Sequence, residues 1–364
     1  MSTLLAITEL ESMTDKFQFF HRAKYFEELQ ARIDQAGMGD RVSLASMTFT
    51  ADGPTVRGLV KALAGAAERG ADVRLAVDAI CFMLDLEMVK PGPLLYGSSM
   101  ERTRRQPHAN IHRVMTELSK AGVSCVVLNR PARPFTNPLA GRSHIKFAAI
   151  NDWVAIGGVN IDDSWQDDAM VGWDDTKAAG LLHGLANKLV ESQTTRGALG
   201  GKDQIIDLRE DVRVLIDAGK PGQSSIFDEA MRLIDEAHEH VLLTCQYYPN
   251  DTTVKHLLAA DNRGVKVKIV YNHPNQHPGP YRILHHGVLA AMKLKLPKHF
   301  FVHPVMKGKP FMHAKVIATD RGAMIGSHNY VTAGVKLGTA EMALEVRTVG
   351  FAGQAELLVA EMLA

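Results

Sequence analysis

Two stretches of the sequence repeat one pattern and decide the fold. Residues 144–160 read HIKFAAINDWVAIGGVN, and residues 313–329 read HAKVIATDRGAMIGSHN. Both contain His-x-Lys, an apolar run, a polar turn, a second apolar run and Gly-[Gly/Ser]-x-Asn. In each copy the first Gly follows the His by 13 residues, and the Asn follows it by 16. Because such a polar pattern rarely recurs by chance at matched spacing, the two stretches indicate an internal duplication.

The duplication extends upstream of both stretches. Residues 59–78 (LVKALAGAAERGADVRLAVD) resemble residues 254–272 (VKHLLAADNRGVKVKIVYN), and each reads as a helix that ends at Arg-Gly and is followed by a strand. The sequence therefore predicts an α/β fold built from two similar halves. The composition of residues 192–204 is that of a linker, so we place the boundary between 1–197 and 198–364.

The bulk composition is that of an ordinary globular protein without a strong global charge. The chain has 364 residues, of which 46% are hydrophobic, so it can bury one large core or two medium ones. Its 41 basic and 40 acidic side chains nearly cancel, so no overall field drives it onto nucleic acid or a membrane. The 3 cysteines form no CxxC pair, which argues against a zinc site or a disulfide framework. We expect no metal and no cofactor.

The sequence predicts no targeting segment and no membrane-spanning helix. Residues 1–16 have no basic region followed by a long apolar run, and no stretch reaches the roughly 18 apolar residues of a membrane helix. We expect a soluble cytoplasmic protein whose contact with membranes, if it has any, is peripheral.

The repeated pattern places a phosphate-binding set of side chains in each half. On a strand, residues i and i+2 of His-x-Lys project from the same face, so the imidazole and the ammonium reach one point together. The Gly-[Gly/Ser]-x-Asn turn returns an amide side chain to the same end of the sheet. The candidate residues are His144, Lys146 and Asn160 in the first half, and His313, Lys315 and Asn329 in the second.

Two such half-sites facing each other would perform a two-step displacement at phosphorus. One His attacks to give a phosphohistidine, and the other protonates the leaving oxygen and then activates water or an alcohol. The lysines and asparagines would stabilise charge on the phosphoryl oxygens, so no divalent ion is needed. The symmetry of the pattern leaves open which His attacks and which acts as the general acid.

The two motifs resemble the paired HKD motifs of the phospholipase D superfamily, and cardiolipin-synthase-like members most of all. The resemblance covers roughly residues 20–350. It implies two α/β/α sandwich halves that share one central active site, and metal-independent phosphohistidine chemistry with His144 as the nucleophile and His313 as the general acid. We expect a monomer, because both half-sites lie in one chain. The motif Asp falls at Asn151 in the first copy, with Asp152 one place later, whereas the second copy keeps Asp320. This departure puts the local geometry of the first half in doubt.

The resemblance also implies an acidic residue that orients each catalytic His. In the first half, the segment GWDDT (172–176) resembles the W-x-D-T passage of cardiolipin-synthase-like members and points to Asp175. In the second half, GTAEMALEV offers Glu341 or Glu345, and we favour Glu341.

Two substrate classes are consistent with the motifs. We expect a phosphodiesterase or phosphatidyltransferase that acts on phospholipids, and the alternative is a nuclease of the same superfamily. Aromatic residues make up only 6% of the chain, which disfavours a stacking channel for nucleic acid. Basic clusters could grip a phosphodiester or an anionic membrane, or they could be solvated loop charges. They are Arg102, Arg104 and Arg105, residues 293–299 and residues 307–309.

Overall fold

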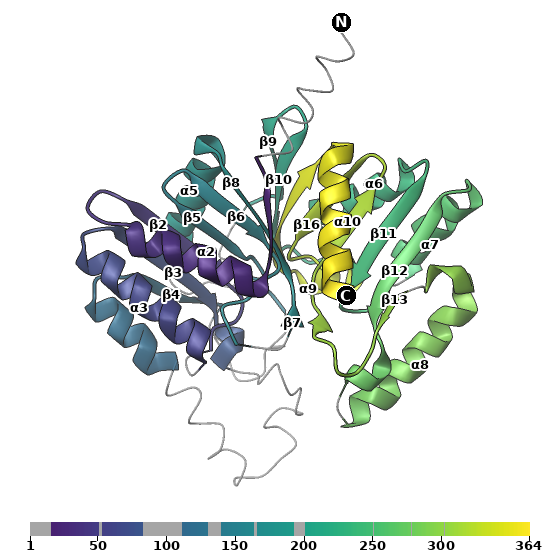
Figure 1. Cartoon of the computed structure of the whole chain (residues 1–364), viewed down its shortest axis with the longest axis horizontal. Coiled ribbons are helices and arrows are strands. Elements are labelled where there is room, and N and C mark those ends of the chain that lie inside the picture. The colour runs from purple at the N-terminus through teal and green to yellow at the C-terminus, as the bar shows by residue number, and fades with distance from the viewer. Residues whose placement is uncertain are drawn as a thin grey trace, which may run out of the picture.

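Two mixed β-sheets, one from each half of the chain, stand side by side at the centre of the molecule (Figure 1). The structure is a computed structural model. It describes residues 16–50, 53–82, 111–129, 140–163, 166–192, 201–249, 251–277, 279–301 and 303–364.

The first sheet has the strand order β1-β8-β6-β5-β2-β3-β4. Its strands β2, β3 and β4 run parallel, as expected where helices connect successive strands, and β5, β6 and β8 are antiparallel. The strands are β1 (Gln18–His21), β2 (Arg41–Ser46), β3 (Asp72–Asp78), β4 (Ser124–Leu128), β5 (Phe147–Ile150), β6 (Trp153–Gly157) and β8 (Ala169–Asp174).

The second sheet repeats this arrangement in the order β13-β12-β11-β15-β16-β17-β10, with β9 added at the edge. Read from β4 to β1, the first sheet matches it strand for strand. The strands are β9 (Gln204–Arg209), β10 (Val212–Ala218), β11 (His240–Cys245), β12 (Lys266–Asn272), β13 (His303–Val305), β15 (Val316–Thr319), β16 (Gly322–Gly326) and β17 (Ala340–Val346). The predicted α/β fold with two pseudo-symmetric halves is confirmed. The boundary that we predicted lies in residues 193–200, outside the described residues.

Helices cover the outer faces of both sheets, and helices α5 (Thr176–Ser192) and α10 (Val349–Leu363) contribute to the core between the two halves. Helices α2 (Arg22–Gln35) and α3 (Pro54–Glu68) pack on the first sheet, as α6 (Ser225–Asp235) and α7 (Asp251–Asn262) do on the second. The remaining helical segments are η1 (Ala79–Phe82), residues 111–120, η3 (Pro274–Gln276), α8 (Gly279–Lys295), η4 (Lys298–Phe300) and α9 (Thr332–Leu337). None of the described helices combines the length and the apolar character needed to cross a bilayer.

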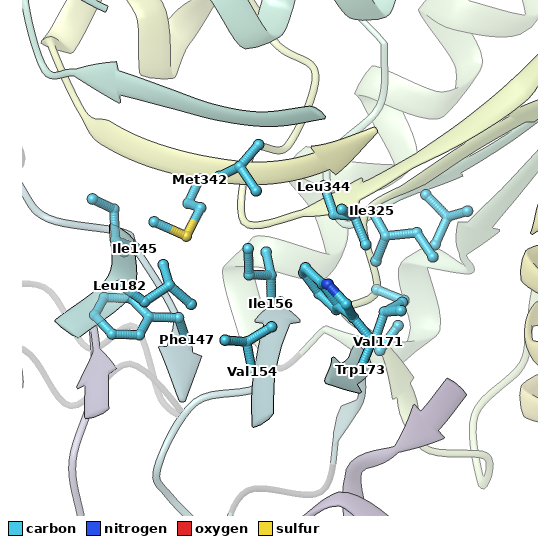
Figure 2. Packing of buried hydrophobic residues seen from close by; sticks show 14 of the residues in the cluster. Ile145, Phe147, Val154, Ile156, Val171, Trp173, Leu182, Ile325, Met342 and Leu344 are labelled. Atoms are coloured by element: carbon cyan, nitrogen blue, oxygen red, sulfur yellow. The ribbon is translucent and has the colours of Figure 1, made fainter. Parts of the chain in front are cut away.

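One hydrophobic core joins the two halves. The inner faces of β6 and β8 lie against β16 and β17, and the strands there are apolar along their length because both faces of each sheet are covered. Helix α10 of the second half also reaches β1 of the first, where Phe351 packs edge-on against Phe17. Figure 2 shows the centre of this core, formed by Ile145, Phe147, Val154, Ile156, Val171, Trp173 and Leu182 together with Ile325, Met342 and Leu344.

The motif departure at Asn151 leaves the local structure intact. Oδ1 of Asn151 accepts a hydrogen bond from the backbone N–H of Arg41 at 3.0 Å, and Oδ1 of Asp320 accepts one from Glu239 N at 3.0 Å. Each side chain thus ties the hairpin of its motif to the start of the neighbouring strand. Asn151 has a φ of 50°, a left-handed conformation that Asn tolerates better than most residues. The doubt that the sequence raised about this half is therefore removed.

Candidate active site

Each motif enters its sheet through a backbone contact with the opposite half. Just before His313, β14 (Phe311–Met312) pairs in parallel with β7 (Gln166–Asp167) of the first half. Just before His144, Ser143 forms a parallel bridge with Ala340 of the second half. The backbone N–H of His144 donates to Ala340 O at 2.8 Å, and that of His313 donates to Asp167 O at 2.7 Å. These contacts hold each motif in register with the other half.

The same registers place each His against a carboxylate of the opposite half. Nδ1 of His144 lies 2.8 Å from Oε2 of Glu341, and Nδ1 of His313 is hydrogen-bonded to Oδ2 of Asp168. All four side chains are buried. Strand pairing shows that the two acids are equivalent. Met170 pairs with Gly157 as Ala343 pairs with Gly326, and each acid lies two residues before its paired residue.

The second residue of the Gly-[Gly/Ser]-x-Asn turn differs between the halves, and this difference matches the different lengths of the two acids. The hydroxyl of Ser327 donates to the carboxylate of Glu341. Gly158 occupies the matching position in the first half, where an added Cβ would lie only 2.1 Å from Oδ1 of Asp168. The shorter Asp side chain therefore requires the Gly, while the longer Glu leaves room for a Ser that fixes it.

The two lysines lie beside the histidines and are buried. Nζ of Lys146 donates to His144 O at 2.8 Å, and Nζ of Lys315 donates to His313 O. Lys315 Nζ also lies 2.8 Å from His313 Nδ1 and 3.8 Å from Oδ2 of Asp168. Each His-x-Lys pair thus acts as one unit, as expected for side chains two residues apart on extended backbone.

Electrostatics favour ionised acids and neutral histidines. Burial by itself would raise the pKa of Glu341, but the hydrogen bond and charge of His144 together with the charges of His328 and Lys146 outweigh burial, and the pKa falls to about 2. Lys315 and His313 likewise hold the pKa of Asp168 well below its usual range in spite of burial. Burial lowers the pKa of His144 more than Glu341 raises it, and burial with Lys315 lowers that of His313 to about 4. The acids therefore accept hydrogen bonds, and the imidazoles are neutral in the free protein.

The lysine charges act across the interface between the halves. Burial, together with the ammonium of Lys315, lowers the pKa of Lys146 to about 7. Burial also lowers the pKa of Lys315 to about 8. Because two ammonium groups repel at short range, a bound anion between them would relieve the repulsion. The two half-sites therefore share one centre, in which the ammonium groups of Lys146 and Lys315 are balanced by the carboxylates of Glu341 and Asp168.

Asn160 and Asn329 end the turns that follow β6 and β16. Asn160 is buried and Asn329 is half-buried. Within the described part of the chain, Oδ1 of each side chain is buried without a hydrogen-bond partner. Because a carbonyl oxygen only accepts, the predicted role of these amides toward a phosphoryl oxygen requires their Nδ2–H groups and not Oδ1 to face it.

The structure corrects our assignment of Asp175. Its Oδ1 accepts the backbone N–H of Ala178 at 2.9 Å, so Asp175 caps the first turn of α5, and Asp168 is the acid bonded to His313. Glu345, the alternative to Glu341, instead pairs with Arg213 and Arg347. The sequence does carry a signal for Asp168, since both Asp168 and Glu341 stand directly before the apolar run of the strand that follows the Asn turn.

A buried polar network supports His144 but differs in the second half. Asp78 accepts from Ser143 N at 2.7 Å and from Nη1 of Arg142 at 3.0 Å. In the second half, Asn272 occupies the position of Asp78, and its Oδ1 accepts Met312 N at 2.8 Å. Both side chains thus hold the residue before the catalytic His. The first half uses a buried ion pair for this, and the sequence analysis missed it.

Comparison with known proteins agrees with the two motifs. The family described as cardiolipin synthase, PLD-like domain, matches residues 29–188 and 230–362. Since these residues are most of the chain, the protein belongs to this phospholipase D-like family. Membership supports an enzyme that acts on phosphodiesters as a phosphodiesterase or phosphatidyltransferase. No curated protein matches the chain in sequence.

Solved structures share the fold at low sequence identity. Phosphatidylserine synthase from Haemophilus influenzae Rd KW20 has a TM-score of 0.65 and 13% identity, covering 96% of this chain and 86% of that one. Polyphosphate kinase from Porphyromonas gingivalis has a TM-score of 0.56 and 11% identity, covering 98% of this chain and 52% of that one. At these identities the comparison shows the fold alone.

Proposed function

We propose that the protein transfers the phosphatidyl group of a phospholipid to water or an alcohol through a phosphohistidine intermediate. The observation that carries this proposal is the reciprocal pairing at the centre, in which each His is bonded to an acid of the other half. Each His also has a buried Lys beside it. This set supplies a nucleophile, a general acid and two cations without a metal.

In the proposed first step, Nε2 of His144 attacks phosphorus while the bond from phosphorus to the leaving oxygen breaks. The imidazole gains positive charge, and the ionised Glu341 stabilises it through Nδ1–H. His313 donates its proton to the leaving oxygen. In the second step His313 removes a proton from water or an alcohol, which attacks phosphorus and releases His144.

Two contacts favour His144 as the nucleophile. Its Nδ1 is bonded to an ionised carboxylate, which fixes the tautomer and leaves the lone pair on Nε2. Nδ1 of His313 has an ammonium beside it as well as a carboxylate, which disfavours a positive charge on that ring until an anionic substrate arrives. A bound phosphodiester would raise the pKa of His313 and prepare it as the acid.

The phospholipid class is supported by the match to the cardiolipin synthase, PLD-like family and by the balanced charge of the chain. The phosphatidylserine synthase that shares the fold also acts, by its name, on a phospholipid. A nuclease is the second candidate. We propose that the protein works as a monomer, because each half supplies one His.

Lipid turnover tests the proposal directly. Phosphatidylglycerol incubated with the protein, with and without glycerol, is separated by thin-layer chromatography to distinguish hydrolysis from transfer. We expect turnover that survives EDTA and that falls by at least about a thousandfold in His144→Asn and in His313→Asn. Wild-type turnover in either variant, or strict dependence on a divalent ion, would overturn the mechanism. Cleavage of DNA but not lipid in parallel reactions would favour the nuclease.

A further inference from the structure

Helix α8 presents an apolar surface to solvent. Among its side chains, Ile283 is 75% exposed, Leu284 is 60% exposed and Leu294 is 89% exposed, and Val288 is also exposed. Large apolar side chains at such exposure are ordinary when scattered singly, but these four come from one helix of 17 residues. The surface therefore calls for a physical explanation.

The exposed residues form one continuous strip. Spacing of three or four residues joins Ile283 to Gly287, Ala290 and Leu294, and joins Leu284 to Val288 and Ala291. All seven are exposed. The opposite side of the helix is anchored in the core of the second half by Leu289, Met292 and Leu296. Helix α8 is thus apolar on the side toward the core and also along the seven residues that face solvent. We call these seven residues the α8 strip.

The segment of the chain that contains α8 has only basic residues among its formally charged side chains. Residues 262–319 contain no Asp or Glu. The basic residues of this segment are Arg263, Lys266, Lys268, Arg282, Lys293, Lys295, Lys298, Lys307, Lys309 and Lys315. Of these, Arg282 and Lys293 flank the strip on the helix, while Lys295 and Lys298 lie at its C-terminal end, and all four are exposed. An apolar strip edged by lysine and arginine suits an interface between water and an anionic lipid layer.

The α8 strip is also connected to the catalytic centre. His285 of α8 stacks on His277 with ring centroids 3.5 Å apart, and His277 packs edge-on against Phe311. Phe311 begins β14, two residues before His313. In Figure 1, α8 extends from the lower end of the second half, the same end at which β7 is seen. A surface bound at α8 would therefore be linked, through His277 and Phe311, to the strand that leads into His313.

We infer that α8 docks the protein on the surface of an anionic phospholipid bilayer. The α8 strip enters the boundary between headgroups and acyl chains, and the basic residues contact lipid phosphates. The inference rests on the proposed function for its purpose, because it brings the site to its substrate, but docking itself needs no turnover. A second copy of the chain is a poorer occupant, because two such faces would bring Arg282, Lys293, Lys295 and Lys298 of each copy together without a compensating acid from residues 262–319.

Vesicle binding tests the inference without using catalysis. The full chain is sedimented with phosphatidylcholine vesicles, with and without phosphatidylglycerol, at low and high salt. We expect binding that requires phosphatidylglycerol and weakens at high salt. Replacing Ile283 and Leu294 together by Asp should lower the partition coefficient at least tenfold. Lys293→Gln with Lys295→Gln should lower it by about fivefold for each lysine removed.

A matched control comes from α10, where Leu357 is 66% exposed. Leu357→Asp changes a similar side chain away from α8 and should leave vesicle binding at the wild-type level. Turnover of a soluble phosphodiester, bis(p-nitrophenyl) phosphate, should be unchanged in the α8 variants, which shows that the fold and the site remain intact. Sedimentation velocity without lipid should give the same mass for wild type and variants.

The outcomes separate the docking surface from the proposed function. Vesicle binding that depends on α8, in a protein that cleaves no phosphodiester, would support docking and overturn the proposed function. Cleavage of soluble phosphodiester without vesicle binding, or vesicle binding unchanged in the Ile283/Leu294 double variant, would overturn docking alone. A dimer that dissociates in the double variant, with no vesicle binding, would identify the α8 strip as a contact between copies and also overturn docking.

Discussion

Nδ1 of His144 lies 2.8 Å from Oε2 of Glu341, although 197 positions separate the two residues and they belong to different halves of the chain. Asp168 and His313 form the equivalent pair, with the acid in the first half and the imidazole in the second. Neither half thus contains a complete His–acid pair. The packing of β6 and β8 on β16 and β17 therefore determines the geometry of the candidate site as well as the stability of the fold.

The two acids Asp168 and Asp175 give a direct test of which carboxylate orients His313. We expect Asp168→Asn to lower kcat by about a hundredfold to ten-thousandfold, because an amide at this position favours the wrong imidazole tautomer. Asp175→Asn should keep both activity and stability near the wild-type level, because Asn caps a helix as well as Asp does. Steady-state rates and thermal melts measure both effects. Loss of activity in the Asp175 variant alone would reverse the assignment.

The duplicated motifs predicted the fold and the positions of the His–Lys pairs because spacing along a strand determines which side chains share a face. Spacing could not predict Asp168. Asp168 follows Asn160 by 8 residues, whereas Glu341 follows Asn329 by 12, because α9 (Thr332–Leu337) lengthens the second connection. The position of each acid before an apolar run hints at their equivalence, and the pairing of β8 with β6 and of β17 with β16 establishes it.

The ion pair of Arg142 and Asp78 was beyond sequence reasoning for another reason. The two residues are 64 positions apart, and in the second half Phe311 and Asn272 occupy the matching positions. A comparison of the two halves by residue identity does not detect these positions, because the residues differ. Asp78 and Asn272 nevertheless have the same role, since each accepts a hydrogen bond from the backbone N–H of the residue before the catalytic His.

The roles of the two histidines can be separated with substrates that differ in leaving group. A nitrophenolate leaves without a proton, whereas an alkoxide needs one from the general acid. We expect His313→Asn to lose about a hundredfold more activity with an alkyl leaving group than with p-nitrophenol. His144→Asn should lose activity equally with both, because it removes the nucleophile. Product release is followed by absorbance and by chromatography, and the opposite pattern would make His313 the nucleophile.

The lysine pair predicts a pH dependence for anion binding. Sulfate does not titrate near neutral pH, so a change in its inhibition constant there reports on the protein. Both lysines are charged below pH 7. As pH rises, Lys146 with a pKa of about 7 loses its proton first and Lys315 with a pKa of about 8 follows. Inhibition by sulfate should weaken by roughly tenfold per pH unit as pH rises above 7, and more steeply above pH 8.

The control for this titration is Lys146→Met, which replaces the ammonium by a side chain of similar length. Sulfate should bind this variant more weakly at low pH, and the loss of binding should begin only near the pKa of Lys315. Burial of the remaining ammonium and its contact with Asp168 persist in this variant. An inhibition constant that stays flat well above pH 8 in the wild type would show that both ammonium groups keep their ordinary pKa values.

The buried ion pair of Arg142 and Asp78 should be replaceable by Phe and Asn, the residues at the matching positions of the second half. Arg142→Phe alone leaves the carboxylate of Asp78 buried without its guanidinium, at a cost of about 3–5 kcal/mol in the free energy of unfolding. Asp78→Asn added to Arg142→Phe reproduces the Asn272 and Phe311 pair of the second half and removes the buried carboxylate charge. We expect the double variant to be more stable than Arg142→Phe by at least about 1 kcal/mol. Urea titrations of both single variants and the double variant measure this coupling, and additive losses would contradict the equivalence of the two halves at this position.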